Sequence, residues 1–272
     1  KVIIEWHFQR GAVIEETVHD KLTSLTNNKC YYMVKERDTN TVTTLPTELV
    51  FTNQPRYTHI SLVDAADPHW VVVAAPDLYP EASWQKLSAA AISASTETVT
   101  TIKDTPGLGW VDNNQISITQ FVAFDMHADT GSSNAYILAQ HAAGAPHGSY
   151  LFSIDKTLTM VANNSVSSTS EEPLHSGAVL HVSGTGVYTA VSNQHGIAGA
   201  LPGDGEVHFW GYDENTLAVI SAGVKVFPMT IRAAPQVCET AACTRLTLCL
   251  SPQTGDIHVY GNQFWNHSGY KL

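Results

Sequence analysis

Short stretches with the pattern of β-strands recur along most of the chain. Apolar and polar residues alternate in residues 57–63, 115–121, 178–182, 187–191, 245–250 and 257–260. Such alternation turns one face of a strand toward a core and the other toward solvent. Residues 70–74 are continuously apolar, which predicts a strand buried on both faces. We therefore expect an all-β protein with an antiparallel β-barrel or sandwich core and long loops.

Turn-forming residues separate these stretches, and one segment departs from the strand pattern. Pro252 and Gly255 bound a polar segment between two alternating stretches, which predicts a hairpin. In residues 80–92, Pro80 stands at a suitable first helical position and apolar residues follow at helical spacing, which predicts one short helix. The sequence shows no internal repeat, so a single β-rich domain over residues 1–272 is the simplest interpretation. Because the chain begins without an initiator methionine, we interpret it as a fragment of a larger precursor.

Charge and composition restrict the classes of partner. The formal net charge is −11, from 14 basic and 25 acidic residues, which argues against nucleic-acid binding because that depends on Lys and Arg meeting phosphates. Since no apolar run approaches the length of a membrane-spanning helix, we expect no membrane insertion.

The cysteines form no Cys-x-x-Cys pair, so a structural zinc site is not expected. Their pairing state is open, with a local disulfide possible between the second and third of Cys30, Cys238, Cys243 and Cys249.

The most specific local motif is Asp129-Thr-Gly-Ser-Ser-Asn134, which resembles the active-site motif of pepsin-like aspartic proteases. That chemistry needs two aspartates that share one proton, and the chain has no second Asp-Ser/Thr-Gly. His127 stands where the protease motif has an apolar residue. Asp bonds readily to nearby backbone and Gly accepts a positive φ. A polar turn between two strands is therefore the favoured interpretation.

Three polar residues before this motif suggest a possible metal site. Asp125, His127 and Asp129 alternate, which on a strand would place them on one face, and His141 or His147 could complete a carboxylate–imidazole set. Polar residues also normally occupy the exposed face of a strand, so we expect no metal. A Gly-x-Ser-x-Gly nucleophile elbow and a dinucleotide-binding glycine motif are both missing from the sequence. We assign no catalytic residue and expect no cofactor.

Aromatic residues near turns are the remaining candidates for a binding surface. The segments His208-Phe-Trp-Gly-Tyr212 and Gln263-Phe-Trp-Asn-His267 each place a Trp among small or polar neighbours. Aromatic side chains give large contact area at low entropic cost, which makes them common binding anchors. Packing at the end of a strand is the alternative role. We predict that receptor-binding anchors come from Trp210, Tyr212, Trp265 and His267.

The character of the chain as a whole resembles the spike domain of an astrovirus capsid protein. The likeness is carried by two segments, Gly107-Leu-Gly-Trp-Val-Asp-Asn-Asn-Gln-Ile-Ser-Ile118 and Asp256-Ile-His-Val-Tyr-Gly-Asn-Gln-Phe-Trp265, and by the acidic, Thr-, Ser- and Asn-rich composition. The resemblance implies an antiparallel β-barrel core with decorated loops, a location on the virion surface, and a homodimeric projection. It also implies attachment to a host-cell receptor, protein or glycan, and recognition by neutralising antibodies.

The leading prediction is therefore a viral surface spike that attaches to a host cell and is not an enzyme. Two alternatives stay open at this point. The first is a β-rich enzyme, either similar to an aspartic protease through Asp129 or carbohydrate-active. The second is a phage or bacterial adhesin.

Overall fold

The protein is described here by a computed structural model, in which the described residues form β-strands and the connections between them. The structure describes residues 2–7, 29–36, 38–52, 57–75, 87–105, 107–111, 115, 117–118, 121–129, 131–141, 149–166, 174–193, 205–229, 244–263 and 266–271. No helix occurs among these residues, and every strand pair is antiparallel. The prediction of an all-β antiparallel fold is confirmed.

The described strands form five sheets, which we number I to V in chain order. Sheet I contains β1 (Val2–His7), β2 (Cys30–Lys35) and β3 (Val42–Leu49). Sheet II contains β4 (Tyr57–Val63), β5 (His69–Ala75), β6 (Ser88–Ser93) and β7 (Val99–Asp104). Sheet III contains β8 (Phe121–His127), β9 (Ala135–His141), β10 (Ser149–Ile154) and β11 (Met160–Val166). Sheet IV contains β12 (Leu174–Val182), β13 (Gly186–Asn193), β14 (Gly205–Tyr212) and β15 (Val219–Met229). Sheet V contains β16 (Thr244–Leu250), β17 (Ile257–Gln263) and β18 (Asn266–Lys271).

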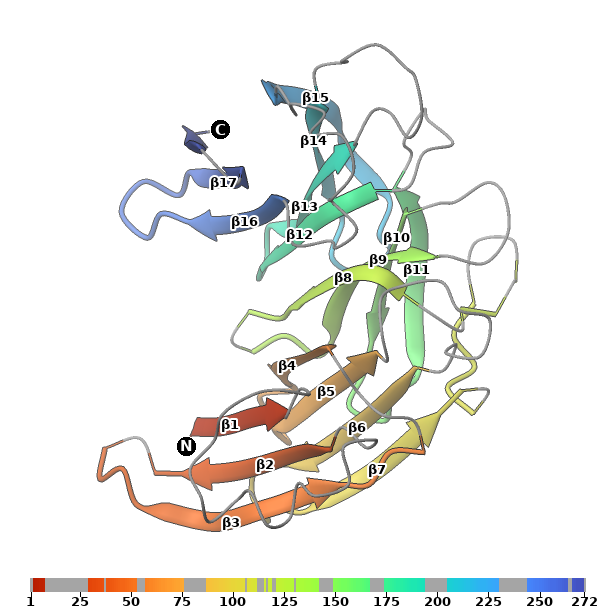
Figure 1. Cartoon of the computed structure of the whole chain (residues 1–272), viewed down its shortest axis with the longest axis vertical. Helices are drawn as coiled ribbons and strands as arrows, with labels where there is room; N and C mark the ends of the chain where they lie inside the picture. The colour runs from red at the N-terminus through yellow and green to blue at the C-terminus, as the bar shows by residue number, and fades with distance from the viewer. Residues whose placement is uncertain are drawn as a thin grey trace.

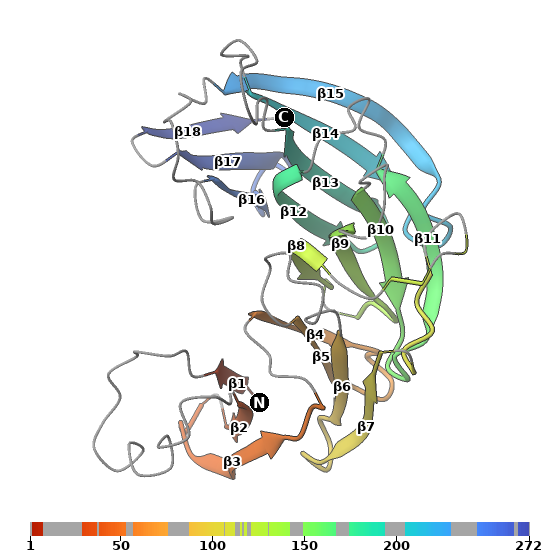
Figure 2. The same cartoon turned by 45° about the vertical axis from the view of Figure 1, so that its right-hand side comes forward.

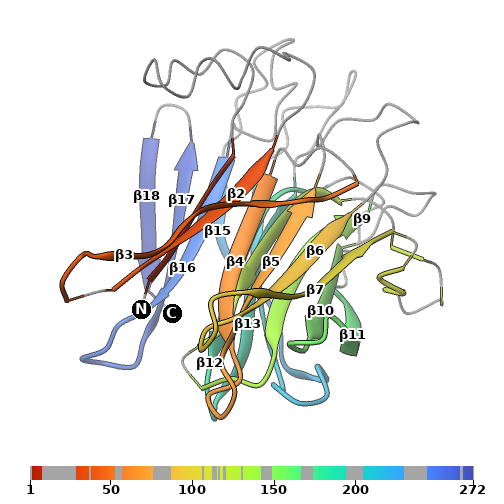
Figure 3. The ribbon, with the colours of Figure 1, turned by 90° about the horizontal axis from the view of Figure 1, so that it is seen from below.

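Each sheet is an up-and-down meander, and the sheets follow one another along an arc (Figure 1 and Figure 2). The first strand of each sheet lies on the inner side of the arc, where β1 contacts β4, β4 contacts β8, β8 contacts β12 and β12 contacts β16. The turns that join β4 to β5 and β12 to β13 lie at the same end of the molecule (Figure 3). This radial repetition of small antiparallel sheets is the arrangement of propeller blades.

Neighbouring sheets pack face to face, as in a sandwich, and we call each such interface a seam. Among the described residues an apolar cluster fills each of the four seams between successive sheets. Strand β5 shows how one strand serves two seams, because Trp70 and Val72 enter the I–II cluster while Val71 and Val73 enter the II–III cluster. The predicted burial of residues 70–74 on both faces is therefore confirmed.

The predicted helix over residues 80–92 is wrong in the part that the structure describes. Residues 88–93 form strand β6, and Ala89, Ala90, Ala91 and Ile92 are completely buried. Their small side chains let two sheets approach both faces of β6, and this packing outweighs the intrinsic helix preference of Ala. Residues 80–86 lie outside the described part of the chain.

Most of the alternating stretches coincide with strands. Residues 57–63 are β4, and 178–182, 187–191, 245–250 and 257–260 lie within β12, β13, β16 and β17, with the predicted hairpin between the last two. Residues 115–121 are the exception, because β8 begins only at Phe121. Gln115 has a φ of 64°, which interrupts an extended strand, and Ser117 forms only an isolated bridge to Val111.

One hairpin turn is repeated in all five described sheets. A threonine is followed directly by a residue with a left-handed backbone, at Thr39–Asn40, Thr96–Glu97, Thr157–Leu158, Thr216–Leu217 and Thr254–Gly255. The first residue of the turn accepts amide hydrogen bonds with its side chain, for example Asp213 Oδ1 from Asn215 N at 3.1 Å and from Thr216 N at 2.8 Å. The expectation of no internal repeat is therefore corrected, since the repeat resides in turn chemistry rather than in the strands.

The left-handed residue of this turn also joins neighbouring sheets. Its carbonyl oxygen accepts a side-chain hydrogen bond in three successive sheets: Glu97 O from Tyr32 Oη at 3.0 Å, Leu158 O from Trp110 Nε1 at 3.1 Å, and Leu217 O from Asn164 Nδ2 at 2.7 Å. Each donor precedes its acceptor sheet in the chain. The turn therefore fastens sheets II, III and IV to the chain segments before them.

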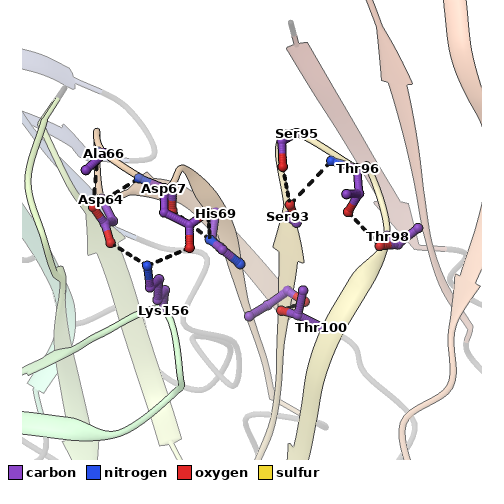
Figure 4. Close-up of polar contacts among 11 residues, drawn as sticks. Asp64, Ala66, Asp67, His69, Ser93, Ser95, Thr96, Thr98, Thr100 and Lys156 are labelled. Atoms are coloured by element: carbon purple, nitrogen blue, oxygen red, sulfur yellow. Dashed lines mark hydrogen bonds and ion pairs between the residues drawn. The ribbon is translucent and has the colours of Figure 1, made fainter.

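An ion-pair clasp joins sheets II and III at their turns (Figure 4). Lys156 Nζ lies 2.7 Å from Asp64 Oδ2 and 2.7 Å from Asp67 Oδ2, so one ammonium bridges both carboxylates of the β4–β5 turn. The paired ammonium lowers the pKa of the Asp64 carboxyl, and the two carboxylates raise the pKa of Lys156. The backbone supports the same junction, because Asp64 N donates to Ser132 O at 2.6 Å.

Candidate functional site

Polar side chains gather where the first strands of sheets II, III and IV meet. Strands β8 and β12 belong to different sheets and share no β-ladder, yet they lie side by side. Alternate residues of β8 and its following turn accept the alternate amides of β12 and its turn. The bonds are Val179 N to Asp125 Oδ2 at 2.9 Å, His181 N to His127 Nδ1 at 3.1 Å, and Ser183 N to Asp129 Oδ2 at 3.1 Å. We call this set of bonds the side-chain ladder.

The side-chain ladder provides hydrogen-bond acceptors for the backbone amides on the free edge of β12. A first strand has backbone amides on its free edge, and buried amides without a partner cost free energy comparable to a lost hydrogen bond. The period of two along β8 matches the period of two along β12, so three successive side chains reach three successive free amides. Asp125, His127 and Asp129 do lie on one face, as the sequence predicted, and that face is turned to β12.

His181 anchors the end of the ladder from the other strand. Its side chain is only 1% exposed, and its Nδ1 accepts the amide of Asp129 at 3.1 Å. A neutral His181 therefore carries its proton on Nε2, which donates to Glu214 Oε2 at 2.9 Å. Glu214 Oε2 also accepts the Gly184 amide at 3.1 Å, and the ring of Tyr136 packs on His181 with centroids 4.5 Å apart.

Asp125 and His59 form the most exposed titratable pair of the cluster. His59 on β4 brings its Nδ1 to 3.5 Å from Asp125 Oδ1, while Asp125 Oδ2 belongs to the side-chain ladder. The side chains are 35% and 28% exposed, so solvent reaches both. Burial raises the pKa of the Asp125 carboxyl above its ordinary value, and this outweighs the opposing effects of His59 and the Val179 amide.

The contacts of His127 define the tautomer of its neutral ring. Its Nδ1 accepts the His181 amide, so the proton of the neutral ring is on Nε2. Burial lowers the pKa of His127 below its ordinary value, and the charge of His181 acts in the same direction, against Asp125 and Asp129. At neutral pH the ring is therefore uncharged.

The polar atoms of this cluster are used within the protein rather than arranged around an ion. Among the described residues, no group of three or more His, Cys, Asp and Glu side chains is placed to bind a metal. His147 and the side chain of His141, which the sequence offered as further ligands, lie outside the described part.

In the Asp129-Thr-Gly-Ser-Ser-Asn134 segment, Asp129 and residues 131–134 lie in the turn between β8 and β9, as predicted. Ser132 N donates to Asp129 O at 3.0 Å, and Gly131 has a φ of 91°. The Asp129 carboxylate accepts an amide of β12, which gives it a role in the seam. The polar-turn interpretation of this motif is therefore confirmed.

The four predicted receptor anchors are placed differently from one another. Trp210 is 9% exposed and Tyr212 is completely buried, and both belong to the apolar cluster of the III–IV seam. Because that seam already covers them, these two residues have little surface to present to a receptor, and their contribution here is packing. His267 lies on β18, and Trp265 lies outside the described residues.

Sequence reasoning missed three members of the cluster, namely His59, His181 and Glu214. His59 and His181 take polar positions in their alternating stretches, so the pattern predicts exposed residues there and gives no signal of this cluster. Glu214 lies in a repeated turn, and its approach to His181 depends on tertiary contacts between β12 and the β14–β15 turn.

Two of the four cysteines lie among the described residues. Cys30 is buried in β2, and Cys249 on β16 carries a free thiol. Cys238 and Cys243 lie outside the described residues.

The described part of the chain contains no helix with the length and hydropathy needed to cross a membrane.

The sequence matches no protein-family model and no curated protein. Solved structures with similar folds include an exo-β-1,3-galactanase from Phanerochaete chrysosporium, with 10% identity, a TM-score of 0.46, and coverage of 90% of this chain and 54% of that chain. A sialidase from Streptococcus pneumoniae has 8% identity and a TM-score of 0.47, over 88% of this chain and 33% of that chain. The β-propeller domain of the Trilobed protease from Pyrococcus furiosus has 9% identity and a TM-score of 0.46, over 91% of this chain and 62% of that chain. The chain spans a little over half the length of the Phanerochaete chrysosporium galactanase.

These structures correct one expectation. The chain was predicted not to be an enzyme, yet the solved structures similar to it include galactanases and a sialidase, which are enzymes. At such identities the likeness concerns the arrangement of the sheets, and the function has to be argued from this chain's own residues.

Proposed function

We propose that this chain is a carbohydrate-active enzyme in which Asp125 acts as the general acid. The supporting observation is the Asp125–His59 pair: a half-buried carboxyl with a raised pKa, 3.5 Å from an imidazole nitrogen and open to solvent. A carboxyl with a raised pKa keeps its proton to a higher pH than an ordinary aspartic acid does, and it can donate that proton to the oxygen of a glycosidic bond as the bond breaks. Water then forms a bond to the sugar carbon, and the proton that the water releases returns to the Asp125 carboxylate.

The contacts of Asp125 and Asp129 support different roles for the two carboxylates. Asp125 Oδ2 is fixed by the Val179 amide, which leaves Oδ1 on the His59 side for proton exchange. Asp129 is four residues further along, about 13 Å in an extended strand. That separation exceeds the ~6.5–9.5 Å between paired carboxylates in inverting glycosidases. Asp129 is therefore assigned to the seam and not to the chemistry.

Hydrolysis of a panel of aryl glycosides and polysaccharides tests this function. We expect the wild-type chain to cleave at least one substrate, and Asp125→Asn to lower kcat about 10²–10⁴-fold, the usual contribution of a general acid. Asn keeps an acceptor oxygen for the Val179 amide, so the ladder survives the change. Asp38→Asn is the matched control, because Asp38 is an exposed turn residue. No cleavage by the wild type, or equal cleavage by Asp125→Asn, would refute the proposal.

Attachment to a host cell as part of a virion surface, which the astrovirus resemblance implies, stays a prediction. The same resemblance implies that the chain forms a homodimer, binds a protein or glycan receptor and is recognised by neutralising antibodies. A molar mass measured by light scattering tests the dimer, and binding to a glycan array tests the receptor class.

A further inference from the structure

We propose that the inner edge of the III–IV seam is an acid-sensitive latch: a proton taken up by His127 removes the acceptor of the His181 amide and loosens β12 from β8. The latch is independent of any catalytic role of Asp125. It rests on the geometry of the side-chain ladder, in which an imidazole nitrogen takes the place of a backbone carbonyl.

The type of acceptor decides which bond of the ladder is sensitive to acid. Asp125 and Asp129 accept amides with carboxylate oxygens, and a protonated carboxyl still keeps an acceptor oxygen. An imidazolium has no acceptor, because both ring nitrogens then carry hydrogen. His127 Nδ1–H would face the His181 N–H across a distance that is now 3.1 Å. The bond must therefore break when His127 is charged.

The surroundings of His127 set the pH range. Burial holds the pKa of His127 below its ordinary value of 6.5, so the folded protein takes up this proton less readily than the unfolded chain does. Stability consequently rises with pH from the folded-state pKa up to about 6.5 and is lost as pH falls through the same range. The titratable groups that face this region from the elements around it are Asp125 and Asp129 on its own side, His59 on β4, Tyr136 on β9, His181 on β12 and Glu214 in the β14–β15 turn.

Contacts outside the His127 bond oppose a larger opening. The His181 ring ties β12 to Asp129, whose amide its Nδ1 accepts, and to Glu214 Oε2, to which its Nε2 donates. Behind the ladder, the apolar cluster of the III–IV seam contains Leu138, Leu151, Val179 and Val191, which do not titrate. We therefore expect acid to free the inner edge of β12 while the two sheets stay packed.

Amide hydrogen exchange followed by NMR tests the latch. Between about pH 7 and about pH 4.5, the protection factor of the His181 amide should fall at least about tenfold in the wild type. His127→Asn replaces Nδ1 by an amide oxygen at a similar position, which accepts the same hydrogen bond and does not titrate. In this variant the His181 amide should keep its protection within about twofold over the same range.

His258→Asn is the matched control, since it changes a half-exposed histidine of sheet V that stacks on Tyr260. It should lose protection at His181 as the wild type does. Nitrogen-15 chemical shifts of the His127 ring give a second measurement that needs no variant. A protonated His127 Nδ1 together with an undiminished protection of the His181 amide would overturn the latch. An equal loss of protection in His127→Asn would overturn it as well.

Discussion

Leu158 and Leu217 occupy the same position in the hairpin turns of two successive sheets, with left-handed backbones of φ 63° and 56°. Both side chains are completely buried, Leu158 in the II–III cluster and Leu217 in the III–IV cluster. Both carbonyl oxygens accept a side-chain hydrogen bond, from Trp110 and from Asn164. A left-handed backbone costs a non-glycine residue about 1–2 kcal/mol. Packing of the leucine in the seam offsets that cost.

Replacement of Leu217 by Gly tests which of these effects is larger. Gly removes the backbone strain of about 1–2 kcal/mol, but the loss of a buried leucine costs about 2–5 kcal/mol. We expect a net decrease of about 2–3 kcal/mol in the free energy of unfolding, measured by urea denaturation. Asn40→Gly changes the equivalent, exposed position of sheet I and should stay within about 0.5 kcal/mol. A stabilised Leu217→Gly would show that strain dominates.

Two glycines of sheet IV should differ in their tolerance of alanine. A Cβ at Gly186, where φ is 152°, would lie 2.6 Å from the backbone oxygen of Tyr212, which cannot move without disturbing β14. A Cβ at Gly177 would lie 2.7 Å from Leu138 Cδ2, the end of a side chain that can rotate. We expect Gly186→Ala to cost about 2–3 kcal/mol and Gly177→Ala about 1 kcal/mol. Thermal denaturation of the two variants side by side checks the order, and the reverse order would contradict it.

The Lys156 clasp should depend on salt. Lys156→Gln leaves Asp64 and Asp67 facing each other without their shared cation, so Tm should fall at low ionic strength. The difference from wild type should shrink between about 0.05 M and about 1 M salt, because exposed charges are screened. Lys35→Gln serves as control, since Lys35 bonds to the neutral amide of Asn40 and should show no such salt dependence. A Tm difference that is constant across salt would assign the effect to packing of the lysine stem.

The Asp125 carboxyl should give the stability a characteristic pH dependence. Its pKa in the folded chain lies above the ordinary 3.8, so the folded state holds the proton over a range where the unfolded chain has released it. The wild-type free energy of unfolding should therefore fall as pH rises from about 3.8 through the folded-state pKa, by at most about 1.4 kcal/mol per pH unit. Asp125→Asn should lack this decline.

A substitution of His59 tests whether the Asp125 carboxyl causes this pH dependence of stability. His59 lowers the pKa of Asp125, so His59→Gln should move the decline to higher pH. Urea titrations of the three proteins at a series of pH values measure both effects. A wild-type free energy of unfolding that rises relative to that of Asp125→Asn as pH increases above about 3.8 would have the wrong sign and would contradict the assignment.

The amino-acid sequence by itself determined the class of the fold and many of its strands. Period-two alternation at 57–63 and 245–250, and the continuous apolar run at 70–74, needed only local information, because strand faces follow directly from residue order. The same holds for the Asp129–Asn134 turn, in which the Ser132 hydroxyl bonds to the backbone of Asn134. The alanines of β6 could not be assigned this way, since their conformation is set by two sheets that cover them.

The tertiary structure alone decided how the polar residues are used. Asp125, His127 and Asp129 were recognisable as one face of a strand, but the amides they accept on β12 and its turn lie 54 residues further along the chain and share no local signal with them. The order of sheets around the arc brings β8 beside β12, and only then does the free edge of β12 require acceptors. The sequence defines which side chains can accept hydrogen bonds. The packing of the apolar seams decides which strands lie side by side, and so which backbone amides these side chains bind.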